Sequence, residues 1–341
     1  MSKGRPLEPG HPAARALARV LSRAPRLSKQ GLRRGARPLR KLRKKWSKVY
    51  RRTTRRLLRA RGSRQPLRRL AGYLVLGHRL GTLAASPRDR AKLWTASGLL
   101  ALRDLYGTPS RKPWELNLQS SGHRFSLRID DLSEIEVLNE VFREQEYAVQ
   151  LPREPEVILD LGSNIGASVH FFRGQYPNAR LIAVEADPRT VAKLRASTER
   201  SPNIEVLAVA IARRDGRRLF YPSRLSWGSS LIQGGPVARQ TERVQPAPIE
   251  VTACSLDSLL DGLDVLSVDV LKIDIEGAEF EALEAFTAMR RVHTLVGEFH
   301  GDLNQRSIHE LAPVFEGFEL EIQSGKRAAG RCWFRATRLA L

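Results

Sequence analysis

The sequence predicts an α/β fold built on a mostly parallel sheet, with helices on both faces. Residues 157–166, VILDLGSNIG, join a short apolar run to a glycine bend and lead into a helical pattern. Residues 181–185, LIAVE, form a second apolar run that ends in a carboxylate. Short continuous apolar runs bounded by glycine are typical of buried parallel strands. Further runs of this kind alternate with helical patterns towards the C-terminus, and such alternation predicts a parallel sheet.

The N-terminal segment, residues 1–70, has a different composition and is expected to form a basic arm. It contains 25 of the 58 Lys and Arg residues but a single acid, Glu8, whereas the remainder has 33 bases against 35 acids. Residues 1–37 are rich in Pro, Gly, Arg and Ala without a sustained period, so we expect disorder. In residues 38–61, apolar positions recur every three or four residues among cationic ones, which predicts a cationic amphipathic helix.

The cationic helix admits three interpretations. It suits the headgroup region of an anionic membrane. Its charges would also bind nucleic acid without sequence preference, but only two aromatic residues interleave them, which is thin for base stacking. The third interpretation is a solvated arm with no specific partner.

The elements between the arm and the sheet are expected to be helical and then a hairpin. Residues 70–83 and 87–107 have helical patterns, and Pro87 suits the first turn of the second helix. Residues 114–118 and 124–129 alternate apolar and polar side chains around Ser-Ser-Gly, which predicts a β-hairpin.

The remaining pattern predicts the sheet and its helices in order. A helix is expected at 131–147, and strands are expected near 156–161, 180–185, 204–209, 268–274 and 293–299. Helices are expected near 166–175, 188–200, 277–289 and 304–315. Residues 217–221 and 249–252 are shorter alternating runs, and the intervening 222–247 is expected to be a loop. Long loops in compact domains often serve as lids or binding segments. The runs 318–323 and 331–337 predict a closing antiparallel pair.

The glycine bend discriminates between nucleotide cofactors. A pyrophosphate loop uses G-x-G-x-x-G, whereas this chain has G-x-x-x-G, Gly162 and Gly166, with Asp160 just ahead. A carboxylate there would repel a pyrophosphate but suits a ligand with an ammonium and a sulfonium, which favours S-adenosylmethionine over NAD. Glu185 lies 23 residues after Gly162, where an acidic residue typically binds ribose hydroxyls. A nicotinamide-dependent oxidoreductase is the less favoured alternative.

Four motifs in order carry a more specific resemblance. They are D-L-G-S-N-I-G, V-E-A-D-P, L-K-I-D-I-E-G-A-E and G-E-F-H, and the upstream segment 125–147 also matches. Over roughly residues 125–299 the chain resembles the FkbM family of S-adenosylmethionine-dependent methyltransferases, although Ala186 stands where the family often has Pro. The resemblance implies a Rossmann-like class I methyltransferase domain at 125–341 with a seven-stranded sheet, preceded by a lead-in at 71–124. It further implies O-methylation of a hydroxyl on a sugar, glycolipid or secondary metabolite, that is, a small-molecule or glycan acceptor. An RNA-binding or RNA-modifying protein that uses the basic arm is the alternative.

Methyl transfer from a sulfonium requires that donor and acceptor are held in line and that water is excluded. We expect Asp160, Gly162, Asn164 and Gly166 to hold the methionine end of the cofactor, and Glu185 to bind the ribose. Val209 and Ala210, after the third strand, are the candidates for the adenine contact. These seven residues are the predicted cofactor site.

The candidate catalytic residues are Asp274, Glu279 and His300. Asp274 ends an apolar run and should emerge at the carboxyl edge of the sheet, whereas Glu279 lies one turn into the next helix. Glu298 and His300 should point to the same side of their strand. His300 can serve as the base near pH 7 or can be a hydrogen-bonded loop residue. Three carboxylates and a histidine can also hold a divalent cation, but the spacing is not diagnostic and no metal site is predicted.

The two cysteines, Cys254 and Cys332, give neither a disulfide framework nor a metal pattern, so free thiols in a reducing compartment are expected. No run of about 18 apolar residues occurs. The predicted localisation is therefore cytoplasmic, with peripheral contact at the inner face of the membrane through residues 38–61.

Overall fold

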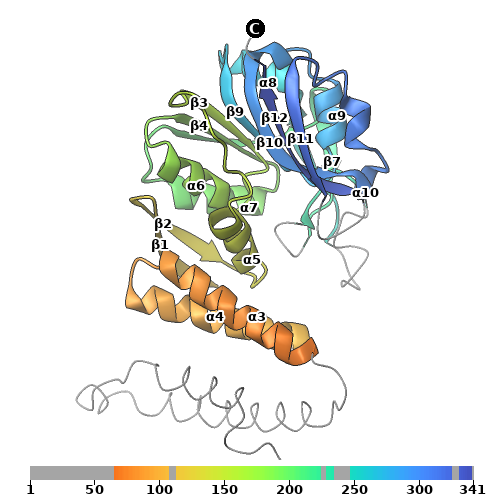
Figure 1. The fold of residues 1–341 in the computed structure, drawn as a ribbon. Coiled ribbons are helices and arrows are strands. Elements are labelled where there is room, and N and C mark those ends of the chain that lie inside the picture. Colours follow the sequence, from red (N-terminus) through yellow and green to blue (C-terminus); the bar gives the residue numbers. More distant parts are fainter. Residues whose placement is uncertain (1–64, 107–112, 224–227, 234–245, 325–329, 340–341) are drawn as a thin grey trace, which may run out of the picture. The chain divides into compact units, whose positions relative to one another are not determined.

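A computed structural model describes residues 65–106, 113–223, 228–233, 246–324 and 330–339 (Figure 1). The chain divides into two compact units, Met1–Pro66 and Leu67–Leu341, and nearly all described residues belong to the second. The predicted disordered segment and cationic helix of the basic arm lie outside the described residues, as does most of the predicted loop at 222–247.

A seven-stranded sheet forms the centre of the second unit, with the strand order β11-β12-β10-β9-β3-β4-β5. Its strands are β3 (Val157–Leu161), β4 (Arg180–Glu185), β5 (Ile204–Ala208), β9 (Val268–Ile273), β10 (Val292–His300), β11 (Phe318–Ser324) and β12 (Arg331–Arg338). β12 is antiparallel to both of its neighbours, and the other neighbouring pairs are parallel. The predicted mostly parallel seven-stranded sheet and its closing antiparallel pair are therefore confirmed.

Helices cover both faces of this sheet, as Figure 1 shows. They are α6 (Ala167–Gln175) and α7 (Pro188–Thr198) on one face, and α8 (Leu256–Gly262) and α9 (Glu279–Glu284) on the other. Successive residues of a strand point to opposite faces. Ile158 accordingly packs in one apolar core with residues of α6 and α7, and Leu159 packs in the other with residues of α8 and α9. This division explains the continuous apolar runs, because both faces of each central strand are buried.

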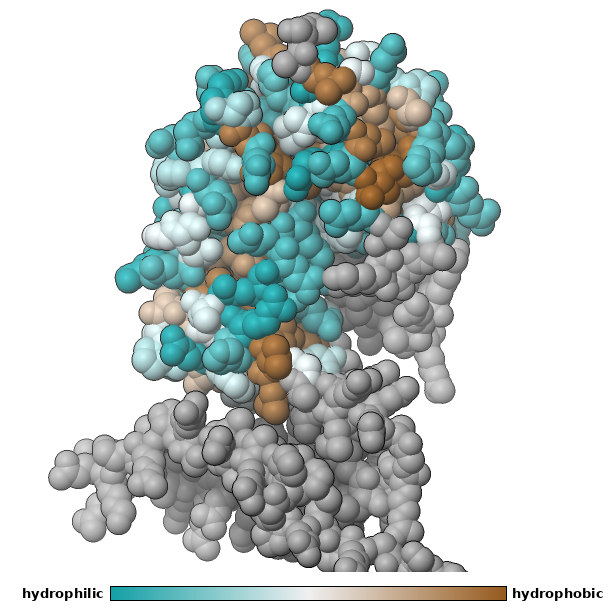
Figure 2. Space-filling model, in the orientation of Figure 1, coloured by the Kyte–Doolittle hydropathy of each residue, from teal (hydrophilic) through white to brown (hydrophobic). Residues whose placement is uncertain are grey.

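The segment before the sheet extends the first core outwards. It consists of α3 (Gln65–Leu80), η2 (Gly81–Leu83), α4 (Pro87–Tyr106), β1 (Trp114–Ser120) and β2 (His123–Ile129). β1 and β2 pair as the predicted antiparallel hairpin around the turn at Ser121 and Gly122, both with positive φ. β2 contacts α6 and α7, and α4 packs on β1. Figure 2 shows that hydrophilic residues cover much of the visible face of the described part.

A second, three-stranded sheet stands beside the main one, in the order β6-β8-β7. Its strands are β6 (Ala210–Ile211), β7 (Gly216–Phe220) and β8 (Ile249–Cys254). β7 and β8 correspond to the two short alternating runs of the sequence. They enclose a small apolar core of their own.

Three expected helices are shorter than the sequence indicates. The helix at 131–147 is α5 (Glu134–Asn139) followed by a wider turn, η3 (Glu140–Glu144). The helix at 277–289 begins only at Glu279, because Gly277 has a φ of 106°. The prediction of a helix at 304–315 is wrong. The short helix α10 (Gly301–Asn304) ends before Gln305, whose φ is 57°, and a 3-10 turn, η6 (Ile308–Leu311), follows. A left-handed residue cannot continue a right-handed helix.

Candidate active site

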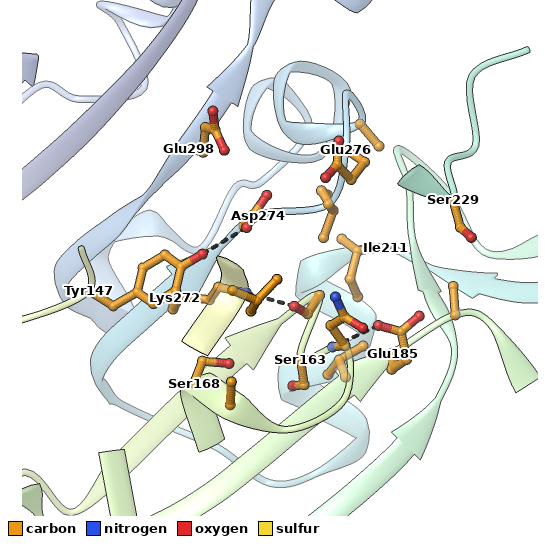
Figure 3. A pocket seen from close by; sticks show the side chains of 18 of the residues that line it. Tyr147, Ser163, Ser168, Glu185, Ile211, Ser229, Lys272, Asp274, Glu276 and Glu298 are labelled. Atoms are coloured by element: carbon orange, nitrogen blue, oxygen red, sulfur yellow. Dashed lines mark hydrogen bonds between the residues drawn. The ribbon is translucent and has the colours of Figure 1, made fainter. Parts of the chain in front are cut away.

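A cavity of about 490 Å³ lies at the carboxyl ends of the central strands (Figure 3). From β3 the chain proceeds to β4 and β5 on one side, and later to β9 and β10 on the other. Ligands of open α/β sheets bind where the strand order reverses in this way. The volume is in the range of small-molecule sites, roughly 300–1,000 Å³.

The glycine bend that follows β3 forms one wall of the cavity. Gly162 has a φ of 74°, and a Cβ there would lie 1.8 Å from the carbonyl oxygen of Asp274. Only glycine therefore allows the bend to pass against the end of β9. Asn164 has a φ of 49°, and Gly166, with a φ of 94°, precedes the first turn of α6. Gly162 and Asn164 line the cavity, whereas Gly166 faces Leu194 and Ser197 of α7.

Asp160, one of the residues expected at the cofactor, is paired with Lys272 inside the protein. Its side chain is buried and does not line the cavity. One carboxylate oxygen accepts a hydrogen bond from Ser168 at 2.5 Å, and the other lies 3.1 Å from Nζ of Lys272. Lys272, also buried, donates to the carbonyl oxygens of Leu161 and Gly162 at 3.0 and 2.7 Å. The Asp160–Lys272 pair thus stabilises the start of the bend.

Glu185 ends β4 and lines the cavity beside the bend. Its carboxylate accepts backbone hydrogen bonds from Asn164 at 2.9 Å and from Asp187 at 2.8 Å. Burial raises the pKa of Glu185 to about 7, and the nearby Asp187 contributes in the same direction. Ala186 is a further backbone donor to this carboxylate, and a carboxylate has about four lone-pair sites, so it can still accept from a ligand hydroxyl. Val209 and Ala210, the residues expected near adenine, line the same cavity.

The cavity wall contains more acidic than basic side chains. Among its described lining residues seven are acidic and two are basic: Glu136, Glu140, Glu185, Asp274, Glu276, Glu298 and Asp302 against Lys272 and Arg331. A pyrophosphate would be repelled by such a wall, and a cationic ligand would be attracted.

Behind the far end of the cavity, His300 is surrounded by carboxylates. The imidazole is completely buried, and its Nδ1 lies 3.0 Å from Oε1 of Glu279. Its Nε2 lies 3.3 Å from Oε2 of Glu276, 3.6 Å from Oε2 of Glu298 and 4.0 Å from Oδ1 of Asp274. The structure therefore brings the three predicted catalytic residues together. Asp274 lines the cavity, but Glu279 and His300 lie behind its wall.

Glu279 is fully occupied by this arrangement. It is buried and accepts hydrogen bonds from the backbone N–H groups of Ile275 and Gly277, both at about 3 Å, in addition to the contact with His300. It therefore orients the imidazole and closes the turn that begins α9. Glu276, at the tip of that turn, has a φ of 52°, a left-handed conformation that is costly for a residue with a Cβ.

The buried charges shift one another's pKa values. Burial raises the pKa of Glu276 to about 8 and that of Glu298 to about 7, and the charge of Asp274 adds to both shifts. Burial would lower the pKa of His300, but Glu279 and Glu276 raise it well above its ordinary value. Burial opposes the ionisation of Glu279, yet His300 keeps its pKa below the ordinary value. With no cation bound beside them, these carboxylates favour the protonated imidazole, which argues against His300 as the expected base.

Three further residues of the site received no role from the sequence. Tyr147 donates its hydroxyl to Oδ2 of Asp274 at 2.8 Å, and burial raises its pKa well above the ordinary value, so it remains a donor. Lys272 lies 5.1 Å from the centre of the Tyr147 ring. Arg331 lies 3.9 Å from Glu298 and donates to Asp302 at 3.0 Å. Tyr147 and Lys272 both belong to segments that carried the family resemblance, which was the available signal.

Comparison with known proteins identifies the family of this chain. The Methyltransferase FkbM domain model matches residues 160–321. The 2-O-methyltransferase NoeI of Sinorhizobium fredii is 30% identical over 207 residues, which is 56% of this chain and 84% of NoeI. The chain belongs to the FkbM methyltransferase family. The hexuronic acid methyltransferase AglP of Haloferax volcanii is 25% identical over 197 residues, 56% of this chain and 77% of AglP.

Family membership confirms that the protein is a methyltransferase and decides against the nicotinamide-dependent oxidoreductase.

A solved structure of Aeropyrum pernix fibrillarin is similar with a TM-score of 0.37 and 12% identity, and the match covers 67% of this chain and 98% of that one. In the described part of the chain, no helix combines the length and the apolar character needed to cross a membrane.

Proposed function

We propose that this FkbM-family protein transfers a methyl group from S-adenosylmethionine to a hydroxyl group of a sugar. The observation that carries the cofactor assignment is the acidic character of the cavity wall, with seven acidic against two basic side chains among the described lining residues. S-adenosylmethionine carries an ammonium and a sulfonium, which suit this wall.

The residues of the cavity fit the parts of such a cofactor. The Glu185 carboxylate would accept hydrogen bonds from the two ribose hydroxyls, and Val209 and Ala210 would contact the adenine. The bend at Gly162 and Asn164 would hold the methionine part, and Oδ1 of Asn164 is buried without a hydrogen-bond partner. Since Asp160 is paired with Lys272, the ammonium would be attracted instead to carboxylates that line the cavity. Glu136 of α5 and Glu140 of η3 are the candidates.

The chain's own contribution to the reaction is alignment and proton removal. S-adenosylmethionine, when bound, supplies a methyl group on a positively charged sulfur. Asp274 lines the cavity beside the bend, with Oδ2 fixed by Tyr147 and Oδ1 without a hydrogen-bond partner. We assign Asp274 as the carboxylate that faces the reacting hydroxyl and assists the loss of its proton. His300 and Glu279, behind the wall, are positioning residues for Asp274 and Glu276.

A sugar acceptor fits the remaining wall. Trp333 and Tyr147, whose ring centres lie 5.6 Å apart, offer aromatic surface, and Glu298, Asp302 and Arg331 offer polar groups for hydroxyls. The names of the relatives NoeI and AglP, a 2-O-methyltransferase and a hexuronic acid methyltransferase, support the same acceptor class.

The test is an incubation of purified protein with methyl-labelled S-adenosylmethionine and, in separate reactions, a glycan fraction, a lipid fraction and RNA. We expect label in the glycan as a base-stable ether and stoichiometric S-adenosylhomocysteine. Asp274→Asn should reduce the rate by at least 10²-fold, a typical range for a group that assists proton transfer. Label in RNA alone, or no transfer to any fraction, would contradict the proposal.

A further inference from the structure

We propose that His300, Asp274 and Glu276 form a binding site for a divalent cation, Mn²⁺ or Mg²⁺, at the acceptor end of the cavity, with Glu298 as a fourth ligand. The site itself follows from the geometry described above. Its role in catalysis rests on the proposed function.

Three buried polar atoms converge on one point without hydrogen-bond partners. They are Nε2 of His300, Oδ1 of Asp274 and Oε2 of Glu276. Nε2 lies 3.3 Å from the Glu276 oxygen and 4.0 Å from the Asp274 oxygen, yet no contact has hydrogen-bond geometry. Buried polar atoms that lack hydrogen-bond partners destabilise the folded state. A shared cation would satisfy all three together.

The separations suit a common metal ion. With metal–ligand bonds of roughly 2.1 Å in octahedral geometry, ligand atoms lie about 3.0 Å apart when adjacent and about 4.2 Å apart when opposite. The separations from Nε2 to Glu276, Glu298 and Asp274, at 3.3, 3.6 and 4.0 Å, fall within these limits. Small movements of the side chains would complete the coordination.

The surroundings of the histidine match those of metal ligands. A ligating imidazole usually donates its other ring nitrogen to a carboxylate, which fixes the ring. Here Nδ1 contacts Glu279, whose oxygens are held by the backbone N–H groups of Ile275 and Gly277, so Nε2 is left to bind the ion. Glu279 is thus a positioning residue, although its distances alone also allow it to join a metal cluster.

Charge and access favour an ion at this point. Four carboxylates surround one imidazole, and the nearest described guanidinium, that of Arg331, is 3.9 Å from Glu298. Asp274, Glu276 and Glu298 line the cavity, so an ion that they bind is open to the acceptor. Carboxylate-rich sites with one imidazole suit Mn²⁺ and Mg²⁺. A hydroxyl coordinated to this ion would be oriented and more acidic, and its proton would pass to Oδ2 of Asp274, the carboxylate oxygen that does not bind the ion.

The experiment is a Mn²⁺ titration of full-length protein from which metal has been removed with a chelator. Free Mn²⁺ is followed by electron paramagnetic resonance. We expect one strong site per chain, and Asp274→Asn, Glu276→Gln and His300→Gln should each weaken it at least tenfold. Glu279→Gln, which weakens the contact that orients the imidazole, should lower the affinity for Mn²⁺ by about 10- to 100-fold. Glu250→Gln, at an exposed carboxylate paired with Arg217, is the control and should leave the site unchanged.

Affinity for S-adenosylmethionine is measured on the same samples by calorimetry, and it reports both folding and the cofactor site. Because His300 lies behind the cavity wall, we expect His300→Gln to bind the cofactor within about threefold of the wild type. The cation site is overturned if the wild type has no strong Mn²⁺ site, or if Asp274→Asn, with cofactor affinity intact, binds Mn²⁺ as the wild type does. Mn²⁺ binding without any cofactor binding would support the site and reject the proposed function.

Discussion

Replacing Lys272 by Met tests the support of the glycine bend. Lys272 and Asp160 are each about 1% exposed, and their charged atoms lie 3.1 Å apart. Removing one partner of a buried ion pair leaves the other charge uncompensated and costs about 3–5 kcal/mol. The carbonyl groups of Leu161 and Gly162 also lose their donor. At roughly 2 °C per kcal/mol for a domain of this size, we expect the melting temperature to fall by about 6–10 °C.

The double variant Asp160→Asn/Lys272→Met separates charge from packing. It removes both charges, and an uncharged replacement of a buried pair is much less costly than a half-broken one. We therefore expect the double variant to melt above Lys272→Met. Arg217→Met, at an exposed pair with Glu250, is the control and should change stability by less than about 1 kcal/mol. Thermal unfolding monitored by tryptophan fluorescence is the assay. The reasoning would be refuted if the melting temperature of Lys272→Met lay within 2 °C of that of the wild type. It would also be refuted if the double variant melted no higher than Lys272→Met.

Three other predictions concern the cavity. Gly162→Ala should abolish cofactor binding and lower the melting temperature, because its Cβ would lie 1.8 Å from the Asp274 carbonyl oxygen; calorimetric binding equal to wild type would contradict this. Since the pKa of Glu185 is about 7 and ribose hydroxyls require the ionised form, the dissociation constant should rise about tenfold from pH 8 to pH 6. The Glu185→Gln variant should lose that pH dependence. A dissociation constant of the wild type that did not change between pH 6 and pH 8 would contradict this role of Glu185. Tyr147→Phe should lower kcat by about tenfold with cofactor affinity unchanged, because it removes the hydrogen bond to Asp274; an unchanged kcat would show that the bond is dispensable.

Much of the fold could be predicted because both faces of the central strands are buried. Ile158 and Leu159 pack in different cores, so the strand appears in the sequence as a continuous apolar run. The helix expected at 304–315 failed for a local reason. Its apolar spacing is helical, but Gln305 adopts a left-handed conformation that periodicity does not reveal.

The candidate site was predictable where a residue type has one main use. Gly162 was predictable because a tight bend after a strand requires glycine, and Glu185 was predictable because it is an acidic residue at the end of the next strand. Both residues line the cavity. The direction of Asp160 was not predictable, because its partner Lys272 lies on β9, 112 residues further along the chain. The same holds for Tyr147, which reaches Asp274 across the cavity from the segment before β3.

The most direct test of the cofactor cradle is calorimetric titration of S-adenosylmethionine into the wild type and Glu185→Ala. One site per chain is predicted for the wild type. Because charge-assisted hydrogen bonds contribute about 1.5–3 kcal/mol each, the affinity of Glu185→Ala should be lower by at least tenfold. Absence of heat with the wild type, or equal affinity of the two proteins, would contradict the assignment.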